Sequence, residues 1–202
     1  MAGLRERKKE LTKRRIAVVA LKLFTERGFE AVTVNEIAET AEVAKATLFT
    51  YFPSKESLVL EGVGDDDLAG IVARRAPDQT PLQALRTHFR TFAAVHTGAI
   101  DWDDVVGRTR VIIASPLLSA AANTLLYQQR QALAEVLAED HGPRAATLMA
   151  AQIAATVLTL QESFFHLLTG GTSPEQATGA LAQDIELAFD LLEHGIDHTK
   201  GK

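Results

Sequence analysis

TVNEIAETAEVAKATLFTYFPSKES, residues 33–57, is the stretch of this sequence that decides its fold. It predicts two short helices joined by a tight turn. The first begins with a capping box, because Thr33 can accept a hydrogen bond from the backbone N–H of Glu36 while the Glu36 side chain bonds back to the cap. The second spans residues 44–52, and Pro53 ends it because proline lacks an N–H and disfavours helical geometry in the residue before it.

Two helices of about two turns each need a third helix to pack against, because helices this short are marginal in water. The preceding segment, residues 11–27, supplies it. Its apolar residues recur at helical spacing, and they are Ile16, Val19, Ala20, Leu23 and Phe24. Gly28 ends this helix with the residue that best tolerates a left-handed cap. A basic segment, residues 5–9, is expected to begin as a mobile arm and to merge into the helix.

The second helix and its surroundings resemble the helix-turn-helix of the TetR family of bacterial transcriptional repressors. The family pattern V-S-x-x-T-L/F-Y-x-Y/H-F-x-x-K-x-x-L stands here as VAKATLFTYFPSKESL over residues 43–58. The resemblance covers the first quarter of the chain, and several positions of the motif agree at once. Three residues depart from the family's usual choice: Glu42 stands where Gly is common, Ala44 where Ser is common, and Phe49 where Tyr is common.

Each departure has an expected consequence. Without glycine, residue 42 must lie in a turn that needs no positive φ, or in a strained one. Without serine, the second helix loses a side-chain cap usually worth about 1 kcal/mol. Phe49 has no hydroxyl to donate to a phosphate, so that contact is expected to be missing.

The resemblance also implies which side chains face DNA. Leu48 and Phe52, four residues apart, are expected to face the core. Base edges in the major groove are expected to meet Lys45, Ala46 and Thr50, since lysine reads guanine acceptors and an alanine methyl can touch a thymine methyl. Phosphates, which set register without reading sequence, are expected to meet Thr33, Thr47, Tyr51 and Lys55. Two alternatives stay open, an ordinary surface role for Lys45 and a half-buried side chain at Tyr51.

Composition fits an N-terminal DNA-binding module on an acidic body. The chain of 202 residues has a net charge of −5, yet residues 1–60 carry 11 basic and 8 acidic side chains against 10 and 18 in the remainder. Such asymmetry favours nucleic-acid binding at the basic end, with a solvated arm as the alternative. The absence of cysteine excludes disulfides and thiolate metal sites and fits a cytoplasmic location. No apolar run follows the basic start, so no signal peptide is expected.

The predicted fold is all-α with about nine helices, in which a three-helix DNA-binding domain (residues 1–54) precedes a larger helical effector-binding and dimerisation domain (residues 55–202). A helix with a glycine-weakened middle is expected from Lys55 to about Arg75, linking the two domains. Gly98 is expected to end the helix that starts at Pro81. The later helices are expected to begin at or just after Thr80, Asp101, Ser115, Pro143 and Ser173.

The last two helices are expected to form a dimer interface. Residues 145–168 are too apolar for a lone surface helix, while interrupting polar residues such as Gln161 and Glu162 favour a buried helix over a membrane span. TetR-like proteins usually dimerise through their last two long helices. The small residues that would allow close approach are Ala150, Ala151, Ala154 and Ala155. The alternative is a pair of central helices in a monomer.

The body is expected to bind a small, largely apolar effector. Candidate pocket residues, each of which can instead be plain core, are Phe89, Phe92, Trp102, Val106, Arg110, Ile113, Leu126, Tyr127 and Phe165. Arg108 and Arg110 can grip an anionic ligand or pair with nearby acids, and with Pro116 they resemble family members that sense fatty acyl thioesters. The spacing of His88, His96 and His166 matches no metal site. No metal or cofactor is predicted.

The resemblance implies a homodimeric DNA-binding regulator, expected to be a repressor that its ligand releases from a palindromic operator. The effector would favour a dimer whose recognition helices no longer match successive major grooves about 34–36 Å apart. The sequence contains no GxSxG, P-loop or HExxH motif, so no enzymatic activity is predicted. The alternative function is a helical scaffold or protein-interaction module that does not bind DNA.

Overall fold

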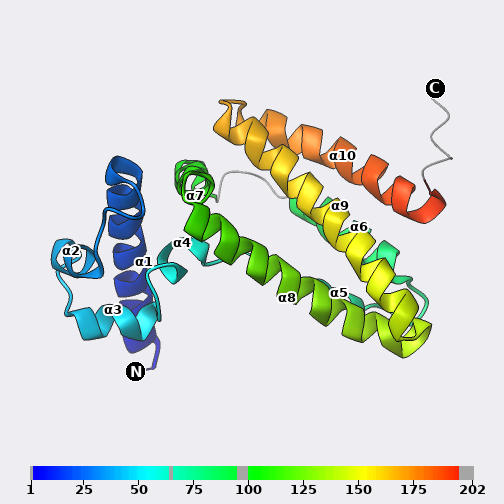
Figure 1. The fold of residues 1–202 in the computed structure, drawn as a ribbon, viewed down its shortest axis with the longest axis horizontal. Coiled ribbons are helices and arrows are strands. Elements are labelled where there is room, and N and C mark those ends of the chain that lie inside the picture. Colours follow the sequence, from blue (N-terminus) through cyan, green and yellow to red (C-terminus); the bar gives the residue numbers. More distant parts are fainter. Residues whose placement is uncertain (1, 64–65, 95–99, 196–202) are drawn as a thin grey trace. The chain divides into compact units, whose positions relative to one another are not determined.

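The computed structural model describes residues 2–63, 66–94 and 100–195, and within these residues every regular element is a helix (Figure 1). The predicted all-α fold is therefore confirmed. The helices are α1 (Ala2–Arg27), α2 (Val34–Thr40), α3 (Lys45–Tyr51), α4 (Ser57–Leu60), α5 (Leu68–Ala73), α6 (Pro81–Ala94), α7 (Trp102–Ala114), α8 (Pro116–His141), α9 (Pro143–Thr169) and α10 (Pro174–His194). They fall into two packing units: α1 to α4 with α7 and the start of α8, and α5, α6, α9 and α10 with the rest of α8.

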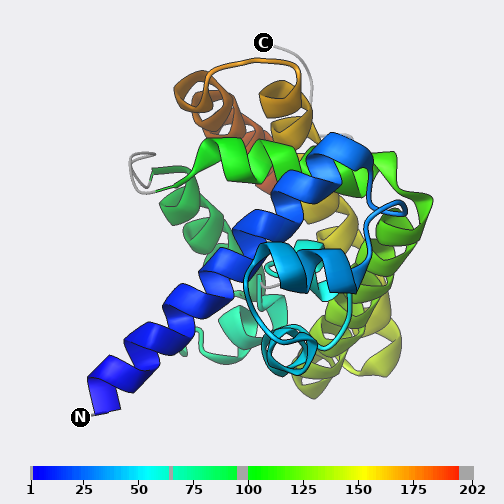
Figure 2. The same cartoon turned by 90° about the vertical axis from the view of Figure 1, so that its left-hand side faces the viewer.

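The first unit is built on α1, against which α2 packs, with α3 following α2 (Figure 2). Its core contains Ile16, Ala20 and Phe24 from one face of α1, all fully or almost fully buried, as the helical spacing predicted. Phe29 joins them, with its ring centroid 5.0 Å from that of Phe24. Gly28 adopts a φ of +85° and donates its N–H to the carbonyl of Phe24 at 2.8 Å, so the predicted left-handed end of α1 is confirmed.

The start of α1 differs from the prediction. Residues 5–9 were expected to begin as a mobile arm, but the helix already begins at Ala2. The physical reason is that arginine, lysine and glutamate are good helix formers and no proline interrupts the segment. Lys9 and Glu6 also lie 3.7 Å apart as an ion pair of the i,i+3 type.

The single helix predicted from Lys55 to about Arg75 is wrong. The described residues form two short helices there, α4 and α5. After α4 the chain reaches a φ of +88° at Gly62, a conformation that an α-helix cannot contain. Asp67 then caps α5 by accepting from the N–H of Gly70 at 2.8 Å. This break raises the helix number from the nine expected to ten within the described residues.

Helix α7 packs on α1 and α4, although it begins about 75 residues after the end of α1 and about 40 after the end of α4. Asp101 caps it through the N–H of Asp104 at 3.2 Å, as predicted. Arg108 donates to the carbonyl oxygen of Glu61 at 2.9 Å and to the Asp104 carboxylate at 2.8 Å. A helix from the middle of the sequence therefore forms part of the unit that contains the helix-turn-helix.

The joint between α7 and α8 is fixed by the buried Ser115. Its hydroxyl donates to the Glu30 carboxylate at 2.5 Å and accepts from the N–H of Leu118 at 3.3 Å. The second bond confirms the predicted cap of α8. The first lowers the pKa of Glu30 and joins residues 85 apart in the sequence.

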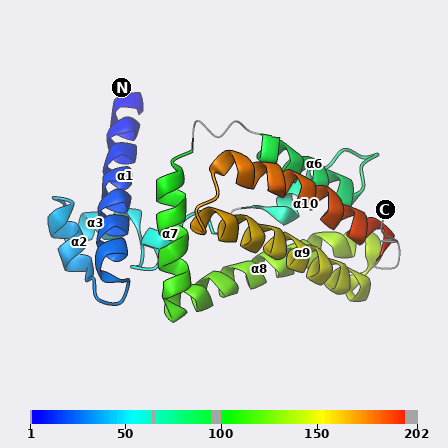
Figure 3. The same cartoon turned by 90° about the horizontal axis from the view of Figure 1, so that it is seen from above.

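In the second unit α10 packs on both α6 and α9 (Figure 3). The core between α6 and α10 includes Phe89 and Phe189, whose ring centroids lie 6.2 Å apart. One face of α9 is buried at three- and four-residue spacing, and it comprises Ala146, Ala150, Ile153, Val157, Leu160, Phe164 and Leu168. Within the described residues α9 alone is long and apolar enough to cross a membrane on its own, by length and composition only. Its buried face is that of a core helix.

The caps predicted for the second unit are present where the structure describes them. Ser173 accepts from the N–H of Gln176 at 3.3 Å at the start of α10. Thr80 and Gln83 exchange backbone-to-side-chain bonds of 3.0 and 3.2 Å at the start of α6. The predicted end of that helix at Gly98, and His96, lie outside the described residues.

Candidate nucleic-acid interface

The turn between α2 and α3 takes the strained form that was one of the two predicted. Glu42 has a φ of +53°, and it is the one non-glycine residue with positive φ in the part of the chain that the structure describes. A side chain in this conformation costs roughly 1–2 kcal/mol. The turn is closed by Val43, whose N–H donates to the carbonyl of Ala38 at 2.9 Å. The strain is therefore stored in the turn directly before α3.

The predicted capping box at the start of α2 is present in full. The N–H of Glu36 donates to the Thr33 hydroxyl at 3.3 Å, and the N–H of Thr33 donates to the Glu36 carboxylate at 2.8 Å. The Thr33 hydroxyl donates to the same carboxylate at 2.8 Å, and Arg27 pairs with it at 2.9 Å. These bonds, the backbone one of Thr33 first, lower the pKa of Glu36 to about 2. To make the predicted phosphate contact, the Thr33 hydroxyl must give up its hydrogen bond to Glu36 and donate to the phosphate instead.

Helix α3 buries one side and exposes the other. Leu48 and Phe52 are buried, as predicted. Lys45, Ala46 and Thr50 are exposed, while Thr47 and Tyr51 are half-buried. The start of the helix has no side-chain cap at Ala44, which the departure from the family pattern predicted.

The Lys55 side chain packs against aromatic rings in the core of the first unit. Its ammonium nitrogen lies 4.2 Å from the ring centroid of Phe29 and 5.8 Å from that of Phe24. Partial burial lowers the pKa of Lys55, against the opposing effect of the Glu30 charge. Lys55 therefore has a packing role that the sequence pattern did not indicate, alongside its predicted phosphate contact.

Phe49 is the side chain on α3 whose position the sequence reasoning left unassigned. It is 40% exposed, although it is the largest apolar side chain of the helix. It follows Lys45 by four positions, so the two share a face of the helix. Helical spacing alone would have identified it as a member of the exposed surface.

The nine predicted pocket residues do not all belong to one packing unit. Four of them lie on α7, in the first unit: Trp102, Val106, Arg110 and Ile113. Five lie on α6, α8 and α9, in the second unit: Phe89, Phe92, Leu126, Tyr127 and Phe165. Phe89 alone among the nine is buried, whereas Phe92, Arg110, Ile113 and Tyr127 are exposed and the others half-buried. The Tyr127 ring carries the Arg130 guanidinium 4.7 Å from its centroid.

A polar cluster in the second unit gathers around Asp66. Gln161 donates to its carboxylate at 3.0 Å, Gln129 donates to its backbone carbonyl, and the His88 ring nitrogen lies 3.6 Å from its other carboxylate oxygen. The four residues come from four different segments of the chain. Nothing in their sequence spacing indicated that they meet. Asp66 and His88 are each about one-third exposed, so the cluster remains accessible to water or a ligand.

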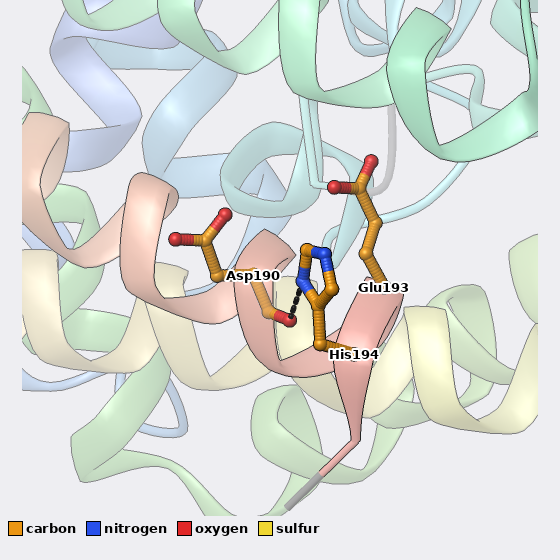
Figure 4. A group of neighbouring side chains, drawn as sticks. All are labelled: Asp190, Glu193 and His194. Carbon is orange, nitrogen blue, oxygen red and sulfur yellow. Dashed lines mark hydrogen bonds between the residues drawn. The ribbon is translucent and has the colours of Figure 1, made fainter. Parts of the chain in front are cut away.

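One group of the described residues has the composition of a cation site: Asp190, Glu193 and His194 on the last turn of α10 (Figure 4). All three are exposed, and their nearest ligand atoms lie within 4.8 Å of one another. The carboxylates already pair with Arg86, at 2.9 Å for Asp190 and 3.3 Å for Glu193. The His194 ring nitrogen lies 3.1 Å from the carbonyl oxygen of Asp190. An ion-pair network at a helix end accounts for this group, and we assign no metal to it.

Comparison with known proteins identifies the family. The family model for bacterial regulatory proteins of the TetR family matches residues 16–61, which contain the helix-turn-helix, and the model for the MftR C-terminal domain matches residues 79–197. This chain belongs to the TetR family. It is 29% identical over 206 residues to the putative mycofactocin biosynthesis transcriptional regulator MftR of Mycobacterium tuberculosis (strain ATCC 25618 / H37Rv), covering 95% of this chain and 94% of that protein. The HTH-type transcriptional regulator TcmR of Streptomyces glaucescens is 32% identical over 146 residues, 69% of this chain and 65% of TcmR.

Solved structures of TetR-family proteins share the fold. The repressor NalD of Pseudomonas aeruginosa matches with a TM-score of 0.61 at 16% identity, over 93% of this chain and 97% of NalD. The repressor FadR of Thermus thermophilus, in complex with lauroyl-CoA, matches with a TM-score of 0.51 at 26% identity, over 94% of this chain and 98% of FadR. The family-model and sequence matches confirm the predicted family and function class. The chain is a DNA-binding transcriptional regulator of the TetR family.

Proposed function

We propose that this TetR-family protein is a cytoplasmic, homodimeric repressor that binds a palindromic operator through α3 and leaves it when a small, largely apolar ligand binds the C-terminal body. The observation that carries the proposal is the two-sided character of α3, in which Leu48 is fully buried while Lys45, Ala46 and Thr50 are exposed. A short helix that exposes this face beside a capped partner helix has the arrangement with which helix-turn-helix proteins enter the major groove. In this proposal residues 1–54 form the DNA-binding domain and residues 55–202 the effector-binding and dimerisation domain.

The test of DNA binding begins with the DNA that flanks the protein's own gene. A short palindrome from that region, prepared as a labelled duplex, should bind the full chain, and the affinity should fall steeply with salt because phosphate contacts release counterions. A helical scaffold without DNA-binding function would bind no duplex, and its apolar partner contacts would respond little to salt. Binding of equal strength to any duplex would contradict a specific operator.

The proposed contacts divide into base-reading and phosphate-positioning groups. Lys45→Ala should alter which sequences are bound, whereas Lys55→Ala should weaken binding to all of them similarly. Because Lys55 also packs on Phe29, the Lys55→Ala measurement needs a thermal melt of the free protein beside it. Uniform loss of affinity in both variants would show that base and phosphate roles are assigned wrongly.

Two exposed leucines, one on α9 and one on α10, support the proposed dimer. Leu148 on α9 and Leu187 on α10 are large, apolar and exposed in the single chain. Burying these side chains against a second copy of the chain would remove apolar surface from water, which favours association. Sedimentation velocity at micromolar concentration should show a dimer for the wild type. Leu148→Glu with Leu187→Glu should shift it toward monomer, while Val18→Glu, an exposed change on α1, should not.

The proposed effector has an apolar part and a polar group. FadR of Thermus thermophilus, which matches at 26% identity, is complexed with lauroyl-CoA, so an acyl thioester is the first class to test. The Asp66 cluster offers a carboxylate and an imidazole that can bond a polar group of such a ligand. Lauroyl-CoA should weaken operator binding, with free coenzyme A as the control. Binding of lauroyl-CoA with unchanged operator affinity would reject ligand-dependent release by this class.

A further inference from the structure

The outward face of α3 carries an apolar strip, defined here as Ala46, Phe49 and Thr50. Ala46 and Phe49 are three positions apart and therefore neighbours on the helix surface, and Thr50 follows directly. All three are exposed, Phe49 by 40%. Leu48, between Ala46 and Thr50 in sequence, is turned inward and fully buried. The strip therefore lies on the exposed side of α3 and not in the core of the first unit.

The hydroxyl of Thr50 does not make the strip polar. It donates to the carbonyl oxygen of Ala46 at 2.9 Å, so its proton is used within the helix. Its methyl group and an acceptor lone pair remain. Within α3, all of whose residues the structure describes, four side chains are exposed, and of these Lys45 is the one that offers free hydrogen-bond donors to a partner. The exposed side of the helix is thus one cation beside an apolar surface.

This chemistry matches one feature of the major groove. Of the four bases, thymine alone presents a methyl group there, and apolar side chains such as Ala, Phe and the methyl of Thr make contact with it. Tyrosine at position 49 could donate its hydroxyl to a phosphate, but phenylalanine has no hydroxyl. Removing the Phe49 ring from water is favourable only where the ring packs against an apolar group.

We propose that Ala46, Phe49 and Thr50 read the 5-methyl groups of thymines next to the base pair that Lys45 contacts, and that Phe49 is the main specificity-determining residue of this strip. The proposal rests on the proposed placement of α3 in the major groove. It predicts half-sites in which thymine is required beside a position read by Lys45. Packing of the Phe49 ring on deoxyribose, which carries no sequence information, is the competing outcome.

The experiment selects bound sequences from a random duplex library with the full-length protein and then replaces thymines in the enriched duplex, one at a time, by deoxyuridine. Deoxyuridine keeps every hydrogen-bonding group of thymine and lacks only the methyl. Loss of one contacted methyl should weaken binding about fourfold, the equivalent of the roughly 0.8 kcal/mol for one buried methyl-sized group. The effect should be confined to one or two positions in each half-site.

Variants assign the effect to the strip. At the thymine whose methyl Phe49 contacts, Phe49→Ala should bind the thymine and deoxyuridine duplexes equally, because the ring that senses this methyl is gone, while any methyl contacted by Ala46 or Thr50 should still be distinguished. Phe49→Tyr should keep the discrimination, since it retains the ring. Val18→Ala removes a comparably exposed apolar side chain from α1 and should also keep it. Phe49 is largely outside the core, so thermal melting of each free variant should show that the fold is intact.

The outcomes distinguish failure of the proposed placement of α3 on DNA from failure of the proposed thymine contacts. If no sequence is enriched, the placement of α3 on DNA fails, and the strip proposal fails with it. If a sequence is enriched but no deoxyuridine substitution weakens binding, the strip proposal alone is overturned. If Phe49→Ala weakens both duplexes by the same factor while the wild type does not distinguish them, the ring packs on the sugar and not on a thymine methyl.

Discussion

The α2–α3 pair and the α6–α10 pair are held together in different ways. Bonds that join near neighbours shape α2–α3: Thr33 and Glu36 lie three residues apart, and the N–H of Val43 bonds to Ala38, five residues before it. In contrast, α6 is bonded to α10 by Arg86 and its partner Glu186, which are 100 residues apart. A short motif can specify the first kind of structure, whereas the second depends on which faces meet after the chain has folded.

The α6–α10 pair combines an apolar core with a partly buried cation. Arg86 has a side chain only 17% exposed and pairs with Glu186, Asp190 and Glu193 at 2.5, 2.9 and 3.3 Å. Arg90 bonds to the same Glu186 carboxylate. A cation at this depth is tolerated because three carboxylates surround it. Local capping bonds therefore shape the first unit around α2 and α3, whereas long-range packing and charge hold α6 and α10 together in the second unit.

The largest effect is expected from the core of the α6–α10 pair. Phe189→Ala should lower the free energy of unfolding by about 3–5 kcal/mol, because it removes a fully buried ring that packs near Phe89. Urea unfolding at one fixed protein concentration measures the change. Gln183→Ala, an exposed change on the same helix, should stay within about 0.5 kcal/mol of the wild type. A loss below about 1 kcal/mol for Phe189→Ala would mean that the pair does not depend on this core.

The charge network should add a smaller, pH-dependent contribution. Hydrogen bonds from Arg90 and then Arg86 lower the pKa of Glu186 to about 2, from 4.5 for an unperturbed carboxyl. Because the folded-state pKa is the lower one, the stabilisation is present above about pH 4.5 and is lost as pH falls toward 2. The carboxylate is 38% exposed, so solvent screening reduces the contribution to about 1 kcal/mol.

Glu186→Gln tests this contribution. The variant should lose about 1 kcal/mol at pH 7 and should then show a flatter decline than the wild type between pH 5 and pH 2, by urea unfolding at each pH. Asp184→Asn, an exposed change two residues away on α10, should follow the wild-type curve. Parallel declines for Glu186→Gln and wild type would remove Glu186 from the network's pH dependence.

The next substitution is at the start of α3 and does not touch the C-terminal body. Ala44→Ser should raise the free energy of unfolding by about 1 kcal/mol, because the backbone at residue 44 is already extended and only the side-chain acceptor is absent. Ala46→Ser, inside the same helix, should give no such gain since serine has a poorer helix propensity than alanine. Thermal melting of the two variants at equal concentration makes the comparison. An equal response of both would show that the start of α3 is not limited by its cap.

The sequence predicts the locally bonded parts of this structure better than the parts that depend on long-range packing. The capping box at Thr33 and the cap at Asp101 could be predicted from local spacing, and the structure contains both. For the turn at Glu42 the sequence predicts two forms, and the structure has the strained one. The helix expected from Lys55 to about Arg75 is wrong because Gly62 does more than weaken its middle: the left-handed conformation of Gly62 prevents α4 from continuing. Beside this break Arg108 donates to the Glu61 carbonyl, a tertiary contact between residues 47 apart that local spacing does not reveal.

Long-range partners could not be predicted from spacing. Helical periodicity tells which residues share a face, but not which face finds a partner, so Phe89 and Phe92 look alike in the sequence while the first is buried and the second exposed. The exposed side of α3 was easier to predict, because the burial of Leu48 fixes the orientation of a seven-residue helix. Lys55 shows the limit of the motif even there, since its packing on Phe29 is a tertiary contact.

The smallest expected effect concerns the strained turn and distinguishes local strain from local contact. Glu42→Gly relieves a left-handed conformation that costs roughly 1–2 kcal/mol, but glycine loses about 0.5–1 kcal/mol through the greater freedom of the unfolded chain. The ion pair of Glu42 with Arg15 is 3.9 Å long and exposed, so its loss costs little. A net gain of about 0.5 kcal/mol follows. Glu42→Ala loses the same ion pair and keeps the strain, so it should gain nothing. If alanine stabilised the protein as much as glycine in urea unfolding, the positive φ of residue 42 would not be the source of the strain.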